Sequence, residues 1–189
     1  MLFRSIVLGK GGSGDLAMAG KTQPPPVVRF VDNGDGTVTD TRTGLMWEQK
    51  TGTYNADGIV VCTGFNCPDP RNVNNVYPWT PTTPPYDGVL LDFLAKINCT
   101  AFMPGGRCGP GLYRDWRIPT IAELQTIADC SFRGCIDPIF GPTAASFSWS
   151  SSVRADFNAL VWGVSFEDGT AWPTDKSNAA YVRAVRGGS

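Results

Sequence analysis

The sequence predicts a single α+β domain that is rich in loops and stapled by disulfides. Three observations support this class: short strand-like runs at both ends, two amphipathic helical segments between them, and 22 glycines with 15 prolines in 189 residues. Glycine and proline at this frequency indicate many turns and long loops rather than a helical bundle. The apolar fraction of 42% is large enough for one hydrophobic core.

The first 26 residues are expected to be a disordered tail or a damaged leader. Met1–Leu8 combines an arginine with a short apolar run, and Ala17–Ala19 resembles a small-residue cleavage site, but Gly9–Asp15 interrupts the apolar stretch that a signal peptide needs. A proline spacer at Pro24–Pro26 ends this tail. We therefore place one domain at residues 27–189.

Three short strands are expected at the start of the domain. Val28–Val31 and Thr37–Asp40 flank Asp32–Gly36, whose Asp, Asn and Gly residues favour a hairpin turn, and Leu45–Trp47 follows as a largely buried strand. Residues 49–85 then form a long irregular insertion, rich in Asn, Pro, Thr and Gly. Loops of this length are uncommon unless they have a role or a local staple.

Two helices are predicted in the middle of the chain. The first, Asp87–Ala101, has a broad apolar face, and the second begins at Thr120 and runs to about Asp129. Thr120 and Glu123 have the spacing of a capping box, and Pro119 keeps the chain extended just before it. The rest is expected to be β-structure, with strands at Ser148–Val153, Ala159–Phe166, Ala171–Trp172 and Ala179–Val185 and a hairpin turn at Glu167–Thr170.

The cysteines fall into close pairs along the chain. Six cysteines allow fifteen connectivities; we expect local pairing because each pair brackets a short loop, and the rival interpretation, a metal site, lacks the two-residue spacing of zinc knuckles. An even number of paired cysteines favours an oxidising compartment, so the protein is expected to be secreted, periplasmic or on the cell surface. The predicted disulfides are Cys62–Cys67, Cys99–Cys108 and Cys130–Cys135.

Composition argues against several functional classes. The chain has no histidine, which removes the commonest general base and zinc ligand. Its net charge of −1 provides no basic field for nucleic acid, and no apolar stretch is long enough for a membrane span. We expect no catalysis, no metal and no cofactor.

Several segments, in the same order along the chain, resemble the Lcl C-terminal domain family, named after a bacterial collagen-like adhesin. The resemblance covers about Arg29–Gly188 and implies a C-type-lectin-like fold, with two helices on a small sheet, in a surface domain used for binding. It further implies a glycan or protein ligand, in some members sulfated glycans bound by a homotrimer; formylglycine-generating enzymes share the fold. The chain departs from the family in its long insertion and in Ala184, where many members carry cysteine. The matching segments are Arg29–Asp40, Thr43–Trp47, Asp115–Thr120 with Glu123 and Leu124, Trp149–Ser152, Trp162–Phe166 and Tyr181–Arg186.

Several chemically suggestive residues have a structural interpretation that we prefer. Asp32, Asp35 and Asp40 suit a hairpin better than a calcium loop, which would need a glutamate where Thr43 stands. The triplet Ser150–Ser152 has no evident activating base, although a Ser–Lys arrangement with Lys176 stays open. Trp116, Trp149 and Trp162 are expected in the core, and Trp172 is the better candidate for an exposed platform. Arg117, Arg183 and Arg186 could bind sulfated glycans, but pairing with Asp115, Glu123 or Asp129 is preferred.

The sequence thus favours an adhesin-like binding domain whose ligand face is made by loops after the Trp149–Ser152 strand and around the Glu167–Lys176 hairpin, because recognition residues commonly lie on loops of a rigid scaffold. Two alternatives remain: a relative of the formylglycine-generating enzymes and a trimerising structural module. The predicted ligand-binding residues are Arg154, Asp156, Asn158, Asp168, Trp172, Asp175 and Lys176.

Overall fold

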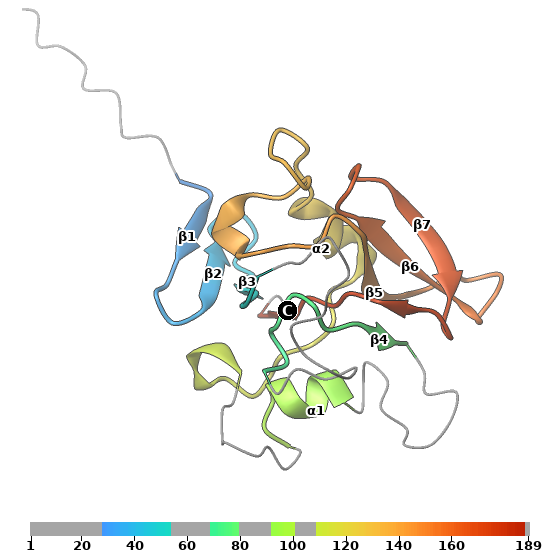
Figure 1. The fold of residues 1–189 in the computed structure, drawn as a ribbon, viewed down its shortest axis with the longest axis horizontal. Coiled ribbons are helices and arrows are strands. Elements are labelled where there is room, and N and C mark those ends of the chain that lie inside the picture. Colours follow the sequence, from blue (N-terminus) through green and yellow to red (C-terminus); the bar gives the residue numbers. More distant parts are fainter. Residues whose placement is uncertain (1–27, 54–68, 80–91, 101–108, 188–189) are drawn as a thin grey trace, which may run out of the picture.

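The structure of the chain is a computed structural model that describes residues 28–53, 69–79, 92–100 and 109–187. Within these ranges it is a mixed α+β protein with antiparallel sheets and two short α-helices, which confirms the predicted class (Figure 1). The family resemblance led us to expect one small sheet, but the strands of the described residues form three separate ones.

The first sheet has the strand order β1-β2-β3-β9 and brings both ends of the domain together. It contains β1 (Phe30–Asp32), β2 (Thr37–Asp40), β3 (Met46–Glu48) and β9 (Val185–Arg186). The predicted hairpin turn is confirmed, because an Asp32 carboxylate oxygen accepts the Gly34 N–H at 2.8 Å and an Asp35 oxygen accepts the Thr37 hydroxyl at 2.6 Å. These aspartates close the turn between β1 and β2.

The other two sheets are formed by later parts of the chain. The three-stranded sheet has the order β5-β6-β7, with β5 at Phe147–Val153, β6 at Leu160–Ser165 and β7 at Ala171–Asp175. The two-stranded sheet pairs β4 (Tyr77–Pro78) with β8 (Ala179–Ala180). In Figure 1 the β5-β6-β7 sheet lies on the side of α2 opposite to β1 and β2.

The second helix begins where the sequence predicts. Helix α2 spans Ile121–Thr126, and the full capping box is present: the Thr120 hydroxyl accepts the Glu123 N–H at 3.2 Å, and the Glu123 carboxylate accepts the Thr120 N–H at 2.7 Å. The helix ends before the predicted Asp129, because the Asp129 N–H already bonds to the Cys135 carbonyl at 2.8 Å and starts the disulfide loop.

The first helix ends earlier than predicted. Helix α1 spans Leu94–Ile97, whereas the prediction ran from 87 to 101; residues 87–91 and 101 lie outside the described ranges. The Asn98 side chain makes two hydrogen bonds to the backbone of Trp116, at 2.8 and 2.9 Å, and Cys99 has a positive φ of 55°. The helix therefore ends because its last turn is bound to the segment that precedes α2.

The predicted strand over 179–185 is wrong in its middle. The chain pairs at β8, makes a single bridge from Tyr181 to Ser148, and joins β3 only at β9. Between them the Ala184 N–H donates to the Glu48 carboxylate at 2.6 Å rather than to a strand carbonyl. The buried Glu48 side chain thus takes the place of the strand carbonyl that would accept this N–H in a β-ladder.

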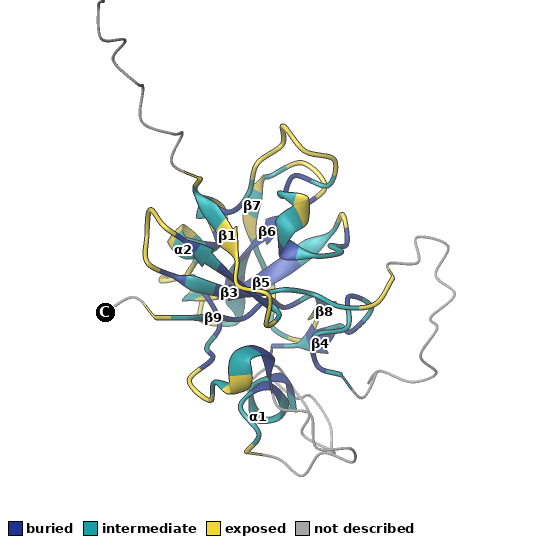
Figure 2. Ribbon diagram, turned by 90° about the vertical axis from the view of Figure 1, so that its left-hand side faces the viewer, coloured by how far each residue is buried: buried dark blue, intermediate teal, exposed yellow. Residues whose placement is uncertain are grey.

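The core of the described residues consists of two packed clusters. Figure 2 shows the buried residues in the interior of the ribbon and the exposed ones mainly in its outer loops. One cluster is built around Trp149, Phe93 and Trp116 and joins α1 to the β5-β6-β7 sheet. The other surrounds Trp47 and Phe140 and joins α2 to the first sheet. Trp116 and Trp149 are buried as predicted, whereas Trp162 is only half-buried.

The described parts of the 49–85 insertion are tied to the domain. The Thr51 N–H donates to the Arg71 carbonyl and the Thr51 carbonyl accepts the Val73 N–H, which makes a parallel bridge between Thr51 and Asn72. Val73, Tyr77 and Trp79 are buried. Cys62 and Cys67 lie outside the described residues, so their predicted disulfide has no structural counterpart to compare.

No helix among the described residues is long and apolar enough to cross a membrane.

Candidate functional site

One end of the β5-β6-β7 sheet gathers most of the predicted ligand-binding residues. Leu160 and Asp175 are opposite each other in the register, and the Lys176 N–H bonds to the Ala159 carbonyl at 3.1 Å. The β5–β6 loop and the β7–β8 turn therefore lie side by side, at the right of Figure 1. We call this surface the sheet end; it contains Arg154, Asp156, Asn158, Asp175 and Lys176.

Trp172 lies on the edge strand of the same sheet and is held by an aromatic row. Its ring is 5.1 Å from that of Phe147, which in turn lies 5.4 Å from Trp149 in the core. The row needs Gly163, the residue opposite Trp172, because a Cβ there would be 2.3 Å from the Phe147 ring. Trp172 is nevertheless 40% exposed, as expected for a platform.

The charged groups at the sheet end differ in whether they already have a hydrogen-bond or ion-pair partner. The Arg154 guanidinium forms a two-bond pair with Asp156, at 2.7 and 2.9 Å, and this hydrogen bonding lowers the pKa of the Asp156 carboxyl. An Asp175 oxygen accepts both the Ser177 N–H and its hydroxyl, so this carboxylate closes a turn. Within the described part of the chain, Lys176 forms no ion pair.

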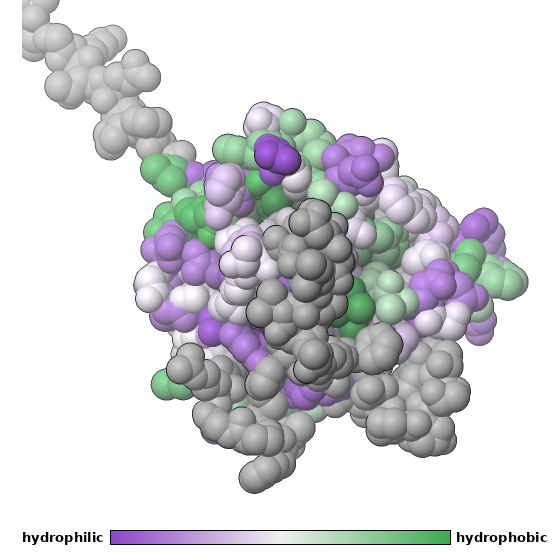
Figure 3. Space-filling model, viewed as in Figure 1, coloured by the Kyte–Doolittle hydropathy of each residue, from purple (hydrophilic) through white to green (hydrophobic). Residues whose placement is uncertain are grey.

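Two residues that the sequence interpretation left out also contribute to this surface. Phe157, in the β5–β6 loop, is 56% exposed. The Asn178 amide donates to the Thr174 hydroxyl at 2.9 Å, and Thr174 shares the sheet face of Trp172, two residues away. At the right edge of Figure 3, over the loop, hydrophilic and hydrophobic side chains lie next to each other. An exposed Phe within the polar run from Arg154 to Asn158 was the available sequence signal.

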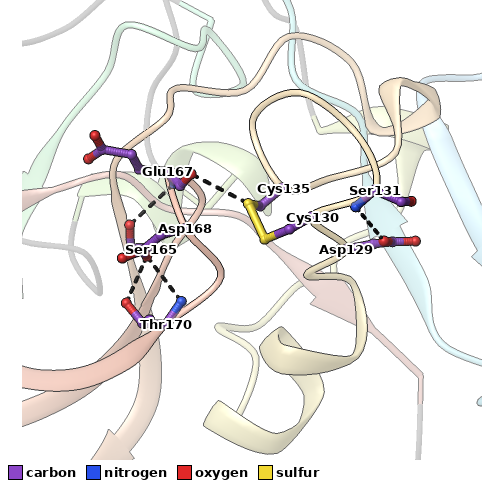
Figure 4. Close-up of a disulfide and its surroundings, with 8 residues drawn as sticks. All are labelled: Asp129, Cys130, Ser131, Cys135, Ser165, Glu167, Asp168 and Thr170. Atoms are coloured by element: carbon purple, nitrogen blue, oxygen red, sulfur yellow. Dashed lines mark hydrogen bonds between the residues drawn. A yellow bond between two sulfur atoms is a disulfide. The ribbon is translucent and has the colours of Figure 1, made fainter.

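Asp168 is separated from the other predicted site residues. It lies in the β6–β7 turn, at the opposite end of the sheet, where its carboxylate accepts the Thr170 N–H at 3.1 Å and the Thr170 hydroxyl at 2.7 Å (Figure 4). The hydrogen bond from the Thr170 hydroxyl is the main cause that lowers the pKa of the Asp168 carboxyl, and the bond from the Thr170 N–H is the second. Its geometry is that of a turn-closing residue.

The same end of the sheet carries the confirmed disulfide between Cys130 and Cys135. The Cys135 sulfur lies 3.4 Å from the Glu167 carbonyl oxygen; since a disulfide sulfur has no hydrogen, this is a contact rather than a hydrogen bond (Figure 4). A Cβ on Gly169 would lie 2.8 Å from the Cys130 sulfur. The disulfide therefore packs against the β6–β7 turn.

The remaining described cysteine is also oxidised. Cys99 is disulfide-bonded, while Cys108, its predicted partner, lies outside the described residues. The described part of the chain thus contains no free thiol. It also holds no group of three or more acidic or cysteine side chains arranged to bind a metal ion.

The arginines considered as an anion patch have other partners. Arg117 pairs with Glu123 at 2.6 Å, and Arg186 pairs with Asp115 at 2.7 Å, as the preferred interpretation predicts. Arg183 differs from that expectation, because it is buried and donates to the carbonyls of Glu48 and Phe140. The serines are structural in geometry: Ser150 donates to the Trp162 carbonyl at 2.6 Å, and Ser152 accepts the Ile121 N–H at 3.0 Å.

Sequence reasoning missed a cluster of buried charges beside Arg183. The fully buried Glu48 carboxylate lies 2.5 Å from the Lys50 ammonium, whose side chain is 9% exposed. Burial lowers the pKa of Lys50, although the nearby Glu48 opposes this shift. Glu48 directly follows the buried Trp47, and Lys50 lies two residues further along. The available sequence signal was therefore a pair of charged residues next to the apolar residues of a core strand.

A concave surface, separate from the sheet end, lies beside α2. It is an open hollow of about 480 Å³ lined by Trp79, Leu94, Arg117, Ile118, Thr120 and Ser151. Its one charged group, Arg117, is already bound to Glu123 and to the Gly187 carbonyl at 2.9 Å. Its lining is mainly apolar, so this hollow offers few free polar groups for recognition.

The search of curated proteins finds no match. The model of the Lcl C-terminal domain matches residues 36–186, which is most of the chain and includes every strand except β1. The chain therefore belongs to the Lcl C-terminal domain family.

Proposed function

We propose that this protein is a ligand-binding domain that works outside the cytoplasm and recognises a glycan through the sheet end and Trp172. The observation that carries the proposal is the exposed Trp172 ring, held by the aromatic row beside a loop and a turn with polar side chains. Family membership supports a C-type-lectin-like scaffold with an adhesin-like role. The disulfides support an oxidising compartment, where such bonds persist.

The chemistry of the surface favours a saccharide over a flat protein partner. Trp172 offers an apolar ring face, while Asn158, Lys176 and Asn178 offer amide and ammonium donors. Trp172 and Asp175 are three residues apart on β7, which is about 10 Å at the usual strand rise. A ligand that contacts both the ring and the sheet end must be extended, as an oligosaccharide is.

Lys176 is the cation best suited to an anionic substituent such as a sulfate. Arg154 is already neutralised by Asp156, and Arg117 and Arg186 by their own carboxylates. A single unpaired cation among the described residues of the sheet end supports modest selectivity for anionic glycans rather than a polyanion site. Asp168 contributes to none of this, because it closes the distant turn.

A glycan array probed with the oxidised protein tests the proposal. We expect retention of one glycan class, and at least a tenfold loss of affinity in Trp172→Ala with a smaller loss in Lys176→Ala. Phe132→Ala is the matched control, because Phe132 is a similarly exposed aromatic, at 37%, on the disulfide loop at the other end of the sheet. Equal binding by the wild type and Trp172→Ala would contradict the proposed site.

A structural, trimerising role is the competing function that family membership supports. It predicts a stable trimer without any ligand signal, so light scattering on the oxidised protein separates the two. A monomer would remove this alternative.

A further inference from the structure

A small pocket of about 10 Å³, partly open to solvent, lies between the segment that follows β3, the start of β5 and the segment that precedes β9. Its lining includes the side chains of Lys50, Arg183 and Ser148 together with Thr143. The volume is close to that of one water-sized sphere, so the cavity accommodates a single small species. Two of the lining groups are cationic, which is unusual for a buried site.

The charges around this cavity do not balance. Among the described residues, Glu48 is the one carboxylate ion-paired with the cluster, and it attracts two cations, Lys50 and Arg183. Asp69 also attracts Lys50, but it is itself paired with Arg71. Its oxygens are already used, one by the Lys50 ammonium at 2.5 Å and the other by the Ala184 N–H at 2.6 Å. The cluster thus carries one uncompensated positive charge when Lys50 is protonated.

Arg183 has no carboxylate of its own. It donates through one terminal nitrogen to the carbonyls of Glu48 and Phe140, at 2.8 and 2.9 Å, and through the other to the Thr143 hydroxyl at 2.8 Å. These neutral oxygens satisfy the N–H donors of the guanidinium, but they do not compensate its positive charge. Burying a charge without a partner of opposite charge costs free energy. Burial accordingly lowers the pKa of Arg183 to about 10.

Donors remain without acceptors around the cavity. A guanidinium has five N–H groups and an ammonium has three; the described residues accept three hydrogen bonds from Arg183 and one ionic contact from Lys50. The Ser148 hydroxyl also has no acceptor among the described residues, whereas Thr143 already donates to Gly141. The one acceptor of the cluster without a hydrogen bond among the described residues, Glu48 Oε1, faces the Lys50 ammonium, and the other unused groups are donors, so the complementary ligand is an acceptor.

We propose that this cavity binds one monatomic anion, chloride under ordinary conditions, between the Lys50 ammonium and the Arg183 guanidinium with the Ser148 hydroxyl as a third donor. The small volume favours a monatomic anion over sulfate, phosphate or a carboxylate, and the donor set and the positive charge favour an anion over water. The bound anion neutralises the cluster and joins the segment after β3 to the segment before β9. The alternative is a water molecule beside a neutral Lys50, since burial lowers the pKa of this ammonium.

The first test is urea unfolding of the oxidised protein at constant ionic strength, with chloride replaced stepwise by gluconate, which is too large for the cavity. Because a ligand that binds only the folded state stabilises it by mass action, the unfolding equilibrium constant falls up to tenfold for each tenfold rise in chloride above its dissociation constant. Lys50→Met should abolish this dependence, and Lys176→Met, which removes an exposed lysine, should retain it.

The second test uses the wild-type protein alone and stays decisive if Lys50→Met fails to fold. Crystals soaked in sodium bromide should show an anomalous peak between Lys50 and Arg183. Identical unfolding in chloride and gluconate, a chloride effect that survives Lys50→Met, or a bromide map without a peak in the cavity would each overturn the proposal. The first and last of these outcomes would assign the cavity to water.

Discussion

Glu48→Gln should be one of the most destabilising conservative substitutions in this protein. The amide keeps the volume of the side chain and can still accept the Ala184 N–H, which Glu48 binds at 2.6 Å. It removes the negative charge that lies 2.5 Å from the Lys50 ammonium. Lys50 and Arg183 are then two buried cations without a carboxylate.

The structure allows the size of this effect to be bounded. Glu48 is fully buried and Arg183 is 2% exposed, so solvent screens the cluster weakly. Removing one partner of a buried ion pair costs about 3–5 kcal/mol. Folded domains are stable by only about 5–15 kcal/mol, so the variant should lose a large share of its free energy of unfolding.

A double-mutant cycle with Lys50→Met measures the pair itself. Since the double variant retains only the Arg183 charge, its loss should be about 1–3 kcal/mol smaller than the sum of the two single losses. Equilibrium urea unfolding of the oxidised proteins supplies all four values. Asp156→Asn, which breaks the exposed pair with Arg154, is the control and should leave the midpoint close to that of the wild type.

Two results would refute this reasoning. A loss below about 1 kcal/mol in Glu48→Gln would mean that the carboxylate is not needed to hold the two cations in the interior. Additive losses in the cycle would mean that Glu48 and Lys50 do not interact in the folded state.

Three further predictions concern the scaffold. Gly163→Ala should cost about 1–3 kcal/mol or more in chemical unfolding, because its Cβ would lie 2.3 Å from both the Phe147 ring and the Ser148 carbonyl; unchanged stability would contradict the packing of the aromatic row. Replacing Cys130 and Cys135 together by serine should lower stability by about 2 kcal/mol, the value for so short a closed loop, and the wild type after reduction should lose at least as much. Hydrogen bonding to Arg117, against the opposing effect of burial, lowers the pKa of Glu123 from 4.5; because this pKa is lower in the folded state, the stabilisation is complete above pH 4.5 and is lost as the pH falls through the lower value. The stability difference between the wild type and Glu123→Gln should therefore be constant near neutrality and shrink in acid, and a difference that grows in acid would reverse the assignment.

Local features of the fold were predictable where neighbouring residues decide the structure. The capping box of Thr120 and Glu123 and the aspartate turn at Asp32–Gly36 formed as predicted, because each satisfies backbone groups within a few residues. The disulfide between Cys130 and Cys135 follows the same logic. Element ends were less predictable, since α1 and α2 are each terminated by a bond to a distant or later segment.

The candidate site was predictable in part. Exposed loop residues with polar side chains could be named, but whether two loops share one end of a sheet depends on strand order. The pairing of Leu160 with Asp175 joins Arg154 to Lys176, whereas Asp168 lies beyond the opposite ends of the same strands.

The sequence by itself determined the α+β class, the family, the hairpin turns, the helix start and the local disulfide, because these depend on residues that are close in the chain. Only the tertiary structure decided the division into three sheets, the support of Trp172 by Phe147 and the meeting of Glu48 with Arg183. Glu48 and Arg183 are 135 positions apart, and no local pattern indicates that their charges share one interior. Burial and partners depend on packing across the whole domain, and that is where the chemistry of the buried cluster originates.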